Sequence, residues 1–352
     1  MVRSSRGHMT QQQIAELAGV SQATVSLVLN GREGRGVRIP NETRRRVLDV
    51  IRSTSYVADP AARRLAGMSN KILGVFTYEP AFPNESADFY TPLLMGIESE
   101  AEKLGCDLLV FTSAPVRDGR RHIFQPNNRI GLADGCLLLG REIDQDDLTQ
   151  LVAIGYPFVA IGRRDVEDVP YVGVDYAGAI GPLVRAALDK GHRRFLYLHV
   201  DSDSESVLDR RDGLLSALAD RPDVTVDLKA GDAQGVAAAF EKAVGEDRPT
   251  AIFIEDPSVA IEFTDALVAA GLSVPADVSI VVLGDSARLS AGQRDFARLC
   301  PPRSELGRLA TRLLDEILNV DGDLPASRLR VLLDCPATLG ATLADAPRGA
   351  DA

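Results

Sequence analysis

The sequence lacks the features that mark metal centres, disulfide scaffolds and membrane proteins. Its four cysteines, Cys106, Cys136, Cys300 and Cys335, are far apart, and no Cys-x-x-Cys or Cys/His cluster joins them. This spacing excludes a disulfide framework and the usual zinc sites, and favours buried, inert thiols. No run approaches the ~18 consecutive apolar residues of a membrane span, and the N-terminus lacks the apolar core of a secretion signal. We therefore expect a cytoplasmic protein.

Motifs for catalysis are missing too. The sequence has no GxSxG, HExxH, P-loop or Gly-rich dinucleotide fingerprint, and its four histidines have no evident partners. The segment DSDSES, residues 201–206, begins like a calcium-binding loop, but Ser206 stands where that loop needs its turn glycine. We interpret it as an exposed polar loop. The sequence therefore predicts no enzymatic activity, no cofactor and no metal site.

Lysine is absent from the first 67 residues, which hold 11 arginines and 5 acidic residues, a net charge of +6. The remaining residues carry −17, which gives the total of −11. A small basic module is thus joined to a large acidic one. This asymmetry suits an anionic partner for the first part, although arginines can also simply solvate a helical surface.

Residues 10–31 predict two short helices joined by a tight turn. Thr10 and Gln13 form a capping box, Gly19 permits the turn and Ser21 caps the second helix. Apolar side chains at helical spacing form the inward faces: Ile14, Leu17 and Ala18, then Val25, Val28 and Leu29. Helices joined so closely cross steeply, as in a helix-turn-helix, although many helical hairpins share this pattern.

The start of the second helix is the part that a helix-turn-helix inserts into the major groove. Gln22 can pair with an adenine edge and Ala23 can touch a thymine methyl. Thr24 or Ser26 can hold a phosphate, and Leu27 is expected to stand off the core.

Residues 41–56 predict a third helix, capped by Asn41 and with an inward stripe of Val47, Val50 and Ile51. Four arginines would border the groove-facing helix and contact phosphates, or else be solvated: Arg35, Arg38, Arg44 and Arg45.

A helix of barely two turns is predicted next, with Asp59 as cap, Pro60 at its first position and Gly67 at its end. So short a helix is largely unfolded alone in water and suits ordering on a partner. Leu65, beside Arg63 and Arg64, has the character of a minor-groove wedge. The alternative is an ordinary linker with an incidental leucine.

Residues 10–67 resemble the DNA-binding headpiece of the LacI/GalR family of bacterial transcriptional regulators. The similarity lies in IAELAGVSQATVSLVLNG, ETRRRV and SYVADPAARRLAG, in that order. It implies a homodimer whose paired hinge helices insert leucines into the minor groove of a palindromic operator. The matching positions are Ala62 and Leu65 in the hinge, and Gln22, Ala23 and Leu27 for base contacts. The loop from Gly31 to Pro40 departs from the pattern, because it is longer than in the best-known members.

From Lys71 onward, short apolar runs alternate with helices. Buried parallel strands are expected in KILGVFTY, CDLLVFTS, DGCLLLG, PFVAIGR, RRFLYLHV, TAIFIED and VSIVVLGD. Helices are expected between them, for instance in PLLMGIESEAEKLG, DDLTQLVAIG, AIGPLVRAALDKG and AIEFTDALVAAG. The predicted fold class is thus a small all-α headpiece followed by a two-lobed, doubly wound α/β domain like a periplasmic binding protein. Its ligand would bind between the lobes, beyond the carboxyl ends of the strands.

Polar side chains at strand ends are the candidate ligand contacts: Thr77, Asp256 and Asp285, with Arg210 opening a helix. Each has an alternative, since Asp256 can cap the next helix and Arg210 can be solvated. The family resemblance favours a role for Arg210 and Gly213 as an effector-contacting Arg-x-x-Gly. It also places Glu255 and Asp256 where the family usually has Asn-Asp.

Two further expectations come from the resemblance. Asp285 lies in a segment that resembles the family's Gly-Phe-Asp-Asp, but Leu283 and Gly284 depart from that motif. Phe89 and Tyr90 occupy the region where the family stacks an aromatic ring on its effector, with core packing as the alternative.

The sequence thus predicts a ligand-controlled DNA-binding regulator, a repressor whose effector is a sugar. Its predicted parts are a basic arm (1–9), a helix-turn-helix domain (10–57), a hinge (58–70), an effector-binding and dimerisation domain (71–340) and a disordered tail (341–352). A solute-binding protein would share the two lobes without the basic headpiece, and an α/β enzyme would need a motif that is missing.

Overall fold

The computed structural model describes residues 9–30, 39–54, 69–80, 84–114, 116–117, 120–125, 129–286, 289, 294–320 and 322–347. The chain divides into two compact units, residues 1–70 and 71–352. We call the first the headpiece and the second the body, and describe each by itself.

The headpiece has three described helices, α1 (Gln11–Ala18), α2 (Gln22–Asn30) and α3 (Asn41–Thr54). The capping box of α1 is confirmed, since the Thr10 amide donates to Gln13 Oε1 at 2.8 Å and the Gln13 amide donates to Thr10 Oγ1 at 3.3 Å. Gly19 makes the turn with a φ of +64°. One small core joins the helices, made of Ile14, Ala15, Ala18, Val25, Val28, Ile39 and Val47.

Two local predictions in the headpiece are wrong. Leu17 is 60% exposed, and Ala15 is buried instead. Because α1 is short, the side chains at positions 14, 15 and 18 are enough to form its contact with the headpiece core. Asn41 is the first residue of α3 rather than its cap, because the Arg44 amide donates to Pro40 O at 3.0 Å.

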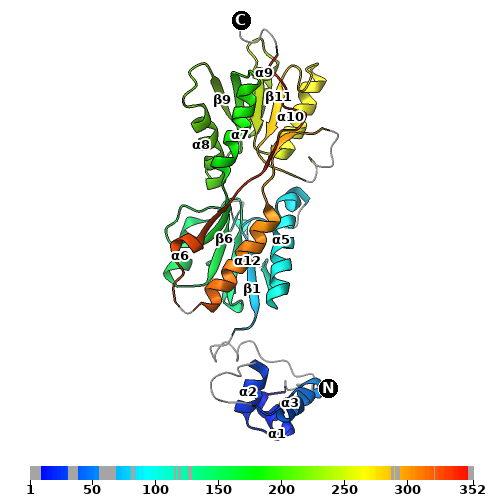
Figure 1. The fold of residues 1–352 in the computed structure, drawn as a ribbon, viewed down its shortest axis with the longest axis vertical. Helices are drawn as coiled ribbons and strands as arrows, with labels where there is room; N and C mark the ends of the chain where they lie inside the picture. The colour runs from blue at the N-terminus through cyan, green and yellow to red at the C-terminus, as the bar shows by residue number, and fades with distance from the viewer. Residues whose placement is uncertain are drawn as a thin grey trace. The chain divides into compact units, whose positions relative to one another are not determined.

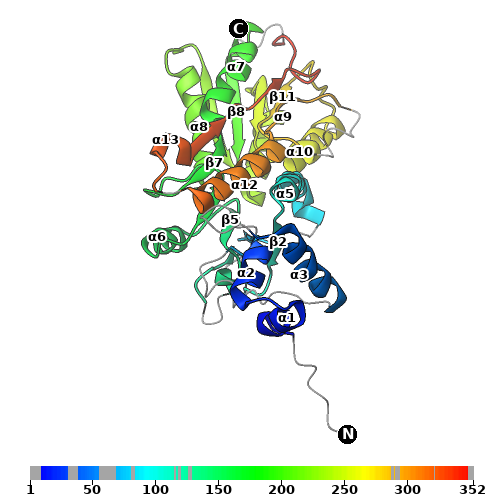
Figure 2. The ribbon, with the colours of Figure 1, turned by 60° about the horizontal axis from the view of Figure 1, so that its bottom comes forward.

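The first lobe of the body is built on a parallel six-stranded sheet in the order β13-β7-β6-β5-β1-β2. Its strands are β1 (Ile72–Thr77), β2 (Asp107–Phe111), β5 (Gly135–Leu139), β6 (Phe158–Ile161), β7 (Tyr171–Val174) and β13 (Arg330–Leu333). Its helices are α5 (Asn84–Leu104), α6 (Gln145–Ala153), α12 (Arg303–Asn319) and α13 (Ala326–Leu329). α12 lies beside α5 in both views (Figure 1, Figure 2). A 3-10 turn (Ile130–Leu132) and the short antiparallel pair β3 (Val116–Arg117) and β4 (Arg120–Arg121) complete it.

The second lobe repeats this plan, with a six-stranded sheet in the order β14-β12-β11-β10-β8-β9. Its strands are β8 (Arg194–His199), β9 (Thr225–Ala230), β10 (Ala251–Ile254), β11 (Ser279–Val282), β12 (Ala297–Leu299) and β14 (Ala337–Thr338). Its helices are α7 (Tyr176–Asp189), α8 (Glu205–Leu218), α9 (Ala233–Val244) and α10 (Pro257–Ala269). Only β14 runs antiparallel to its neighbour, β12. The predicted two-lobed α/β architecture is therefore confirmed.

The chain passes between the lobes three times, after β7, after β12 and after β13 (Figure 1). The first and third passages are tied together, because the Asp175 amide donates to Leu333 O at 2.9 Å. One buried apolar cluster takes members from both lobes, among them Val174, Phe195 and Leu306. The carboxyl ends of both sheets consequently border the space between the lobes.

The end of the chain differs from the prediction. The disordered tail predicted from residue 341 is wrong for residues 341–347, because Thr342 and Leu343 are buried. Thr342 Oγ1 donates to Ile280 O at 2.7 Å and accepts from the Ala297 amide at 2.9 Å, so this segment is fixed to the second sheet.

Two helices begin earlier than predicted. α5 starts at Asn84 and contains Pro92, and α8 starts at Glu205, which places Arg210 in the middle of that helix. Among the described helices, none is both long enough and apolar enough to span a bilayer.

Candidate DNA-binding and ligand-binding sites

The start of α2 presents the side chains predicted to contact base edges. Gln22 and Ala23 are exposed, while Thr24 and Ser26 are half-buried. The Thr24 hydroxyl lies 2.9 Å from that of the capping serine, so the cap holds it in place. Leu27 packs partly against the headpiece core, which corrects the expectation that it stands off it. Of the side chains predicted to contact bases, Gln22 and Ala23 are therefore the exposed ones.

Only part of the predicted phosphate and hinge contacts can be placed. Arg44 is half-buried and Arg45 exposed near the start of α3. The other predicted contacts lie outside the described residues, namely Arg35, Arg38, Ala62, Arg63 and Leu65.

A cavity of about 400 Å³ lies between the lobes of the body. The first lobe lines it with segments that follow β1, β5 and β6, and the second with segments that follow β8, β10 and β11. This is the edge at which α/β sheets bind ligands. Its walls hold five arginines, six carboxylates and three serines beside apolar side chains such as Phe89 and Leu306. Such a lining offers many hydrogen bonds to a polar ligand.

Arg210 reaches the cavity from the middle of α8. Its Nη1 donates to Ser206 O at 2.9 Å, its Nε donates to Leu283 O at 3.0 Å, and its guanidinium lies 3.7 Å from the centre of the Tyr176 ring. A Cβ at Gly213 would lie 2.7 Å from Ala177 O, so glycine is needed there for α8 to approach α7. The predicted Arg-x-x-Gly thus combines a fixed cation with a close helix contact.

Glu255 and Asp256 both line the cavity, at the end of β10. The buried Glu255 carboxylate accepts from the Tyr197 hydroxyl, and from the Val200 amide at 2.8 Å. Burial, together with the Glu255 carboxylate, raises the pKa of Tyr197 above its ordinary value. Asp256 Oδ1 caps α10, as the alternative interpretation expected, and accepts from the amides of residues 258 and 259 at 2.8 and 3.2 Å.

Phe89 lies in the cavity wall, with the guanidinium carbons of Arg141 and Arg303 each 5.6 Å from its ring centre. Tyr90 is buried behind it, and its hydroxyl donates to the Glu79 carboxylate. Burial and this carboxylate raise the pKa of Tyr90 above its ordinary value. Glu79 also accepts from the Arg141 amide at 3.1 Å.

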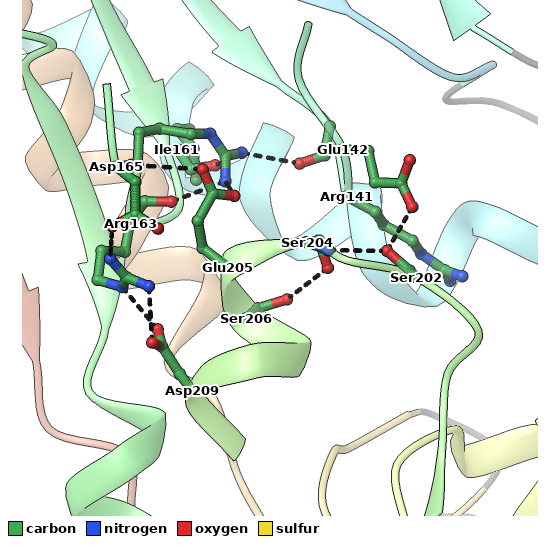
Figure 3. Close-up of polar contacts among 12 residues, drawn as sticks. Arg141, Glu142, Ile161, Arg163, Asp165, Ser202, Ser204, Glu205, Ser206 and Asp209 are labelled. Carbon is green, nitrogen blue, oxygen red and sulfur yellow. Dashed lines mark hydrogen bonds and ion pairs between the residues drawn. The ribbon is translucent and has the colours of Figure 1, made fainter. Parts of the chain in front are cut away.

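Polar bonds across the cavity join the two lobes (Figure 3). The Arg163 guanidinium, after β6, makes two parallel bonds of 2.7 Å to the Asp209 carboxylate on α8. These bonds raise the pKa of Arg163 above its ordinary value. The Ser202 hydroxyl donates to the Glu142 carboxylate, also across the cavity.

Arg164 makes the most buried of these connections, being 4% exposed. Its Nη1 donates to Glu205 Oε2 at 3.1 Å, and its Nη2 donates to Gly140 O at 3.1 Å and Ile161 O at 3.3 Å. Burial lowers the pKa of Arg164, and the Glu205 carboxylate opposes that change. Within the described chain its Nε has no hydrogen-bond partner.

A second group of polar side chains lies away from the cavity. His122, Asp144 and Asp147 place their side-chain N and O atoms within 4.8 Å of one another. One oxygen of each carboxylate already accepts within the protein, since Asp144 caps α6 and Asp147 accepts from the Tyr78 hydroxyl at 3.2 Å and the Ile123 amide at 2.8 Å. The other Asp144 oxygen lies 3.4 Å from His122 Nδ1. We therefore assign this cluster a structural role.

Comparison with known families assigns both units of the chain. Residues 10–59 match the model of bacterial regulatory proteins of the lacI family, and residues 184–336 match that of the periplasmic binding protein-like domain. The chain thus combines a lacI-family DNA-binding domain with a periplasmic binding protein-like domain. The resemblance inferred from the headpiece motifs is confirmed.

Relatives of this lacI-family chain align over most of its length. The regulator AglR of Rhizobium meliloti is 29% identical over 330 residues, 90% of each chain. Catabolite control protein A of Priestia megaterium is 28% identical over 332 residues, covering 89% of this chain and 93% of that protein. Both are regulators, and this lacI-family chain is accordingly a DNA-binding transcriptional regulator.

Solved structures share the fold. The lac repressor dimer bound to operator and the anti-inducer ONPF superimposes with a TM-score of 0.71 at 20% identity, over 96% of this chain and 99% of that one. The complex of the regulator CelR with cellobiose superimposes with a TM-score of 0.63 at 23% identity, over 95% of this chain and 99% of that one.

Three residues predicted to contact the effector of this lacI-family protein lie outside the cavity wall. Thr77 is 1% exposed and accepts from Arg121 Nη1 at 2.9 Å, and Tyr90 is equally buried. Asp285 Oδ1 accepts from Arg298 Nε at 3.1 Å. We no longer assign effector contacts to these three, since each is occupied by packing or by an internal partner. Phe89, Arg210 and Asp256 do line the cavity.

Sequence reasoning missed the serines of the cavity and all of its arginines except Arg210. The segment 201–206 is not simply an exposed loop, because Ser202, Ser204 and Ser206 line the cavity and Glu205 binds Arg164. Polar residues directly after the strand ending at Ile161 were the available signal for Arg163 and Arg164, by the same rule that selected Asp256.

Proposed function

We propose that this lacI-family regulator acts in the cytoplasm as a homodimeric repressor. A sugar bound between the lobes of each body would control its affinity for a palindromic operator. The single observation that carries the proposal is the cavity itself. Its walls come from both lobes, so a ligand there contacts both and can bias their arrangement.

The headpiece supports the DNA-binding half of the proposal. Gln22 and Ala23 are exposed at the start of α2, where a helix-turn-helix meets the major groove. Pairing two headpieces in one dimer raises the effective concentration of the second after the first has bound. Insertion of Leu65 into the minor groove stays part of the proposal.

The cavity supports the sugar-binding half. Phe89 offers an apolar ring, and carboxylates and guanidiniums line the same cavity. Among the relatives, CelR has been solved with cellobiose, and another is named the ribose operon repressor of Haemophilus influenzae. Sugars are therefore the first ligand class to test.

A salt-titrated binding assay tests the whole proposal, with DNA from upstream of the protein's own gene and a panel of sugars. We expect tight, competitor-resistant binding with a steep salt slope, which one sugar alters. Weak binding that is equal on all DNA would contradict the operator assignment.

Replacing Gln22 with Ala tests base contact directly. We expect loss of preference at one symmetric operator position, worth about 1–3 kcal/mol for a bidentate pair, measured by binding-site selection. Gln12→Ala, an exposed glutamine on α1, is the matched control and should leave the preference unchanged. An unchanged preference in Gln22→Ala would remove that residue from the interface.

A further inference from the structure

The cavity of the body holds two kinds of arginine. Arg163 and Arg164 are neutralised by carboxylates of the second lobe, Asp209 and Glu205. These two pairs hold the lobes together and leave no net charge for a ligand.

The other three arginines of the cavity have no carboxylate partner among the described residues. Arg210 donates only to backbone carbonyls and stacks on Tyr176. Arg303 Nη1 donates to a backbone carbonyl, that of Asp285, at 3.2 Å. Arg141 bonds to Glu79 through its backbone amide, not through its guanidinium. Both Arg141 and Arg303 lie against the ring of Phe89.

Five further carboxylates line the cavity, so its net charge is not positive. Four of them already accept hydrogen bonds within the protein, and the fifth, Asp201, is exposed. Glu79 accepts from the Tyr90 hydroxyl and from two backbone amides. Glu255 accepts from Tyr197 and a backbone amide, and Asp256 caps α10. Glu142 accepts from Ser202. Beside Phe89, the Arg141 and Arg303 guanidiniums therefore keep more free hydrogen-bonding capacity than the Glu79 carboxylate.

The start of α12 is an independent feature that favours an anion. Arg303 is the first residue of this 17-residue helix, and its cap, Pro302, supplies no side-chain acceptor. The Arg303 amide donates to Pro301 O at 2.8 Å, and the Glu305 carboxylate in the same turn is paired with Arg308. A helix N-terminus favours anions. Arg303 and Leu306, both in that first turn, line the cavity.

We propose that the cavity contains an anion subsite beside Phe89, formed by Arg141, Arg303 and the N-terminus of α12. The effector would accordingly be an acidic sugar, carrying a carboxylate or a phosphate. Phe89 would contact its apolar ring face, and Arg210 would bind its hydroxyl groups or the same anion. This inference rests on the proposed function, since it names the ligand class of the same cavity.

Inorganic phosphate is the first probe, because it requires no knowledge of the sugar. Phosphate should raise the Tm of the full-length wild-type protein above its value in chloride at equal ionic strength. This rise should shrink in Arg141→Gln/Arg303→Gln. Arg221→Gln, on the outer surface of the second lobe, is the matched control, and phosphate should raise its Tm as much as that of the wild type. An equal rise in all three proteins would be a general salt effect and would overturn the subsite.

Titration calorimetry with matched sugars then separates carboxylate from phosphate. The panel contains D-glucose, D-galactose, their uronates and their 6-phosphates, with operator binding as a second readout. We expect an acidic member to bind, with an affinity that falls as salt rises and falls about tenfold or more in Arg303→Gln. Binding of a neutral sugar that both arginine substitutions leave unchanged would overturn the anion subsite while preserving the proposed function. A phosphate effect that depends on the arginines, with no sugar changing operator binding, would support the subsite and count against sugar control.

Discussion

The two lobes of the body share one architecture, yet they supply opposite partners to the ion pairs that join them. Each is a six-stranded sheet covered by helices. The first lobe supplies Arg163 and Arg164 to the facing surfaces, and the second supplies Glu205 and Asp209. The fold therefore decides where the cavity lies, whereas the residues after each strand decide what holds the lobes together.

This difference separates two kinds of contact between the lobes. The apolar cluster at the chain passages is non-directional and tolerates small shifts. The arginine–carboxylate pairs are directional, so they specify one arrangement of the lobes. A ligand that changes the arrangement must therefore compete with the pairs.

Removing Glu205 should break the lobe contact most severely. Glu205→Ala leaves the buried Arg164 charge without its carboxylate, and breaking a buried pair typically destabilises a protein by about 3–5 kcal/mol. Urea denaturation measures the loss. The double variant Arg164→Met/Glu205→Leu is the control, and it should recover most of the stability because no lone charge remains. A double variant as unstable as Glu205→Ala would show that the loss of stability comes from packing and not from the unpaired charge.

Removing Asp209 should have a smaller effect. Asp209→Asn weakens a two-bond pair whose side chains are 22% and 17% exposed, and we expect a loss of about 1–2 kcal/mol in urea denaturation. Asp223→Asn is the comparison, because Asp223 binds Arg221 and Arg193 within the second lobe, and the Arg221 and Asp223 side chains are 34% and 49% exposed. That control should destabilise the protein clearly less than Asp209→Asn does, because solvent screens exposed ion pairs. Equal losses in both variants would mean that bridging the lobes adds nothing.

The smallest effect concerns pH and belongs to the second lobe alone. Burial lowers the pKa of His192, whose Nε2 lies 2.9 Å from Ala344 O. Since its folded pKa lies below the unfolded value of 6.5, the unfolded chain takes up the proton first. Stability should therefore fall as pH drops below about 6.5, by less than about 1 kcal/mol between pH 7 and 6.

Comparing His192→Gln with wild type isolates this contribution. The difference in free energy of unfolding between the two proteins should change over that pH range and stay constant from pH 7 to 8. A difference that is flat from pH 5 to 8 would contradict the assignment.

Helix caps, turns and strands could be predicted from the sequence wherever residues close together along the chain determine them. The Thr10–Gln13 capping box, the Gly19 turn and the apolar strands follow from residue type and short spacing, because each depends on bonds within a few residues. Two errors were made at this level. The burial of Leu17 was wrong because packing among the three helices decides which face of α1 is buried, and the cap of α3 was wrong because the Arg44 amide bonds to Pro40 O.

The sequence by itself determined a basic helix-turn-helix joined to a two-lobed α/β body, since periodicity and charge carry that information. Only the tertiary structure decided which polar side chains meet. Arg163 binds Asp209 from 46 residues away, and Arg164 binds Glu205 from 41 residues away. Thr77, Tyr90 and Asp285 have the residue types of ligand contacts but are held by packing or internal partners. Strand ends gather polar groups at one edge, and the packing of the second lobe against the first selects those that remain open to a ligand.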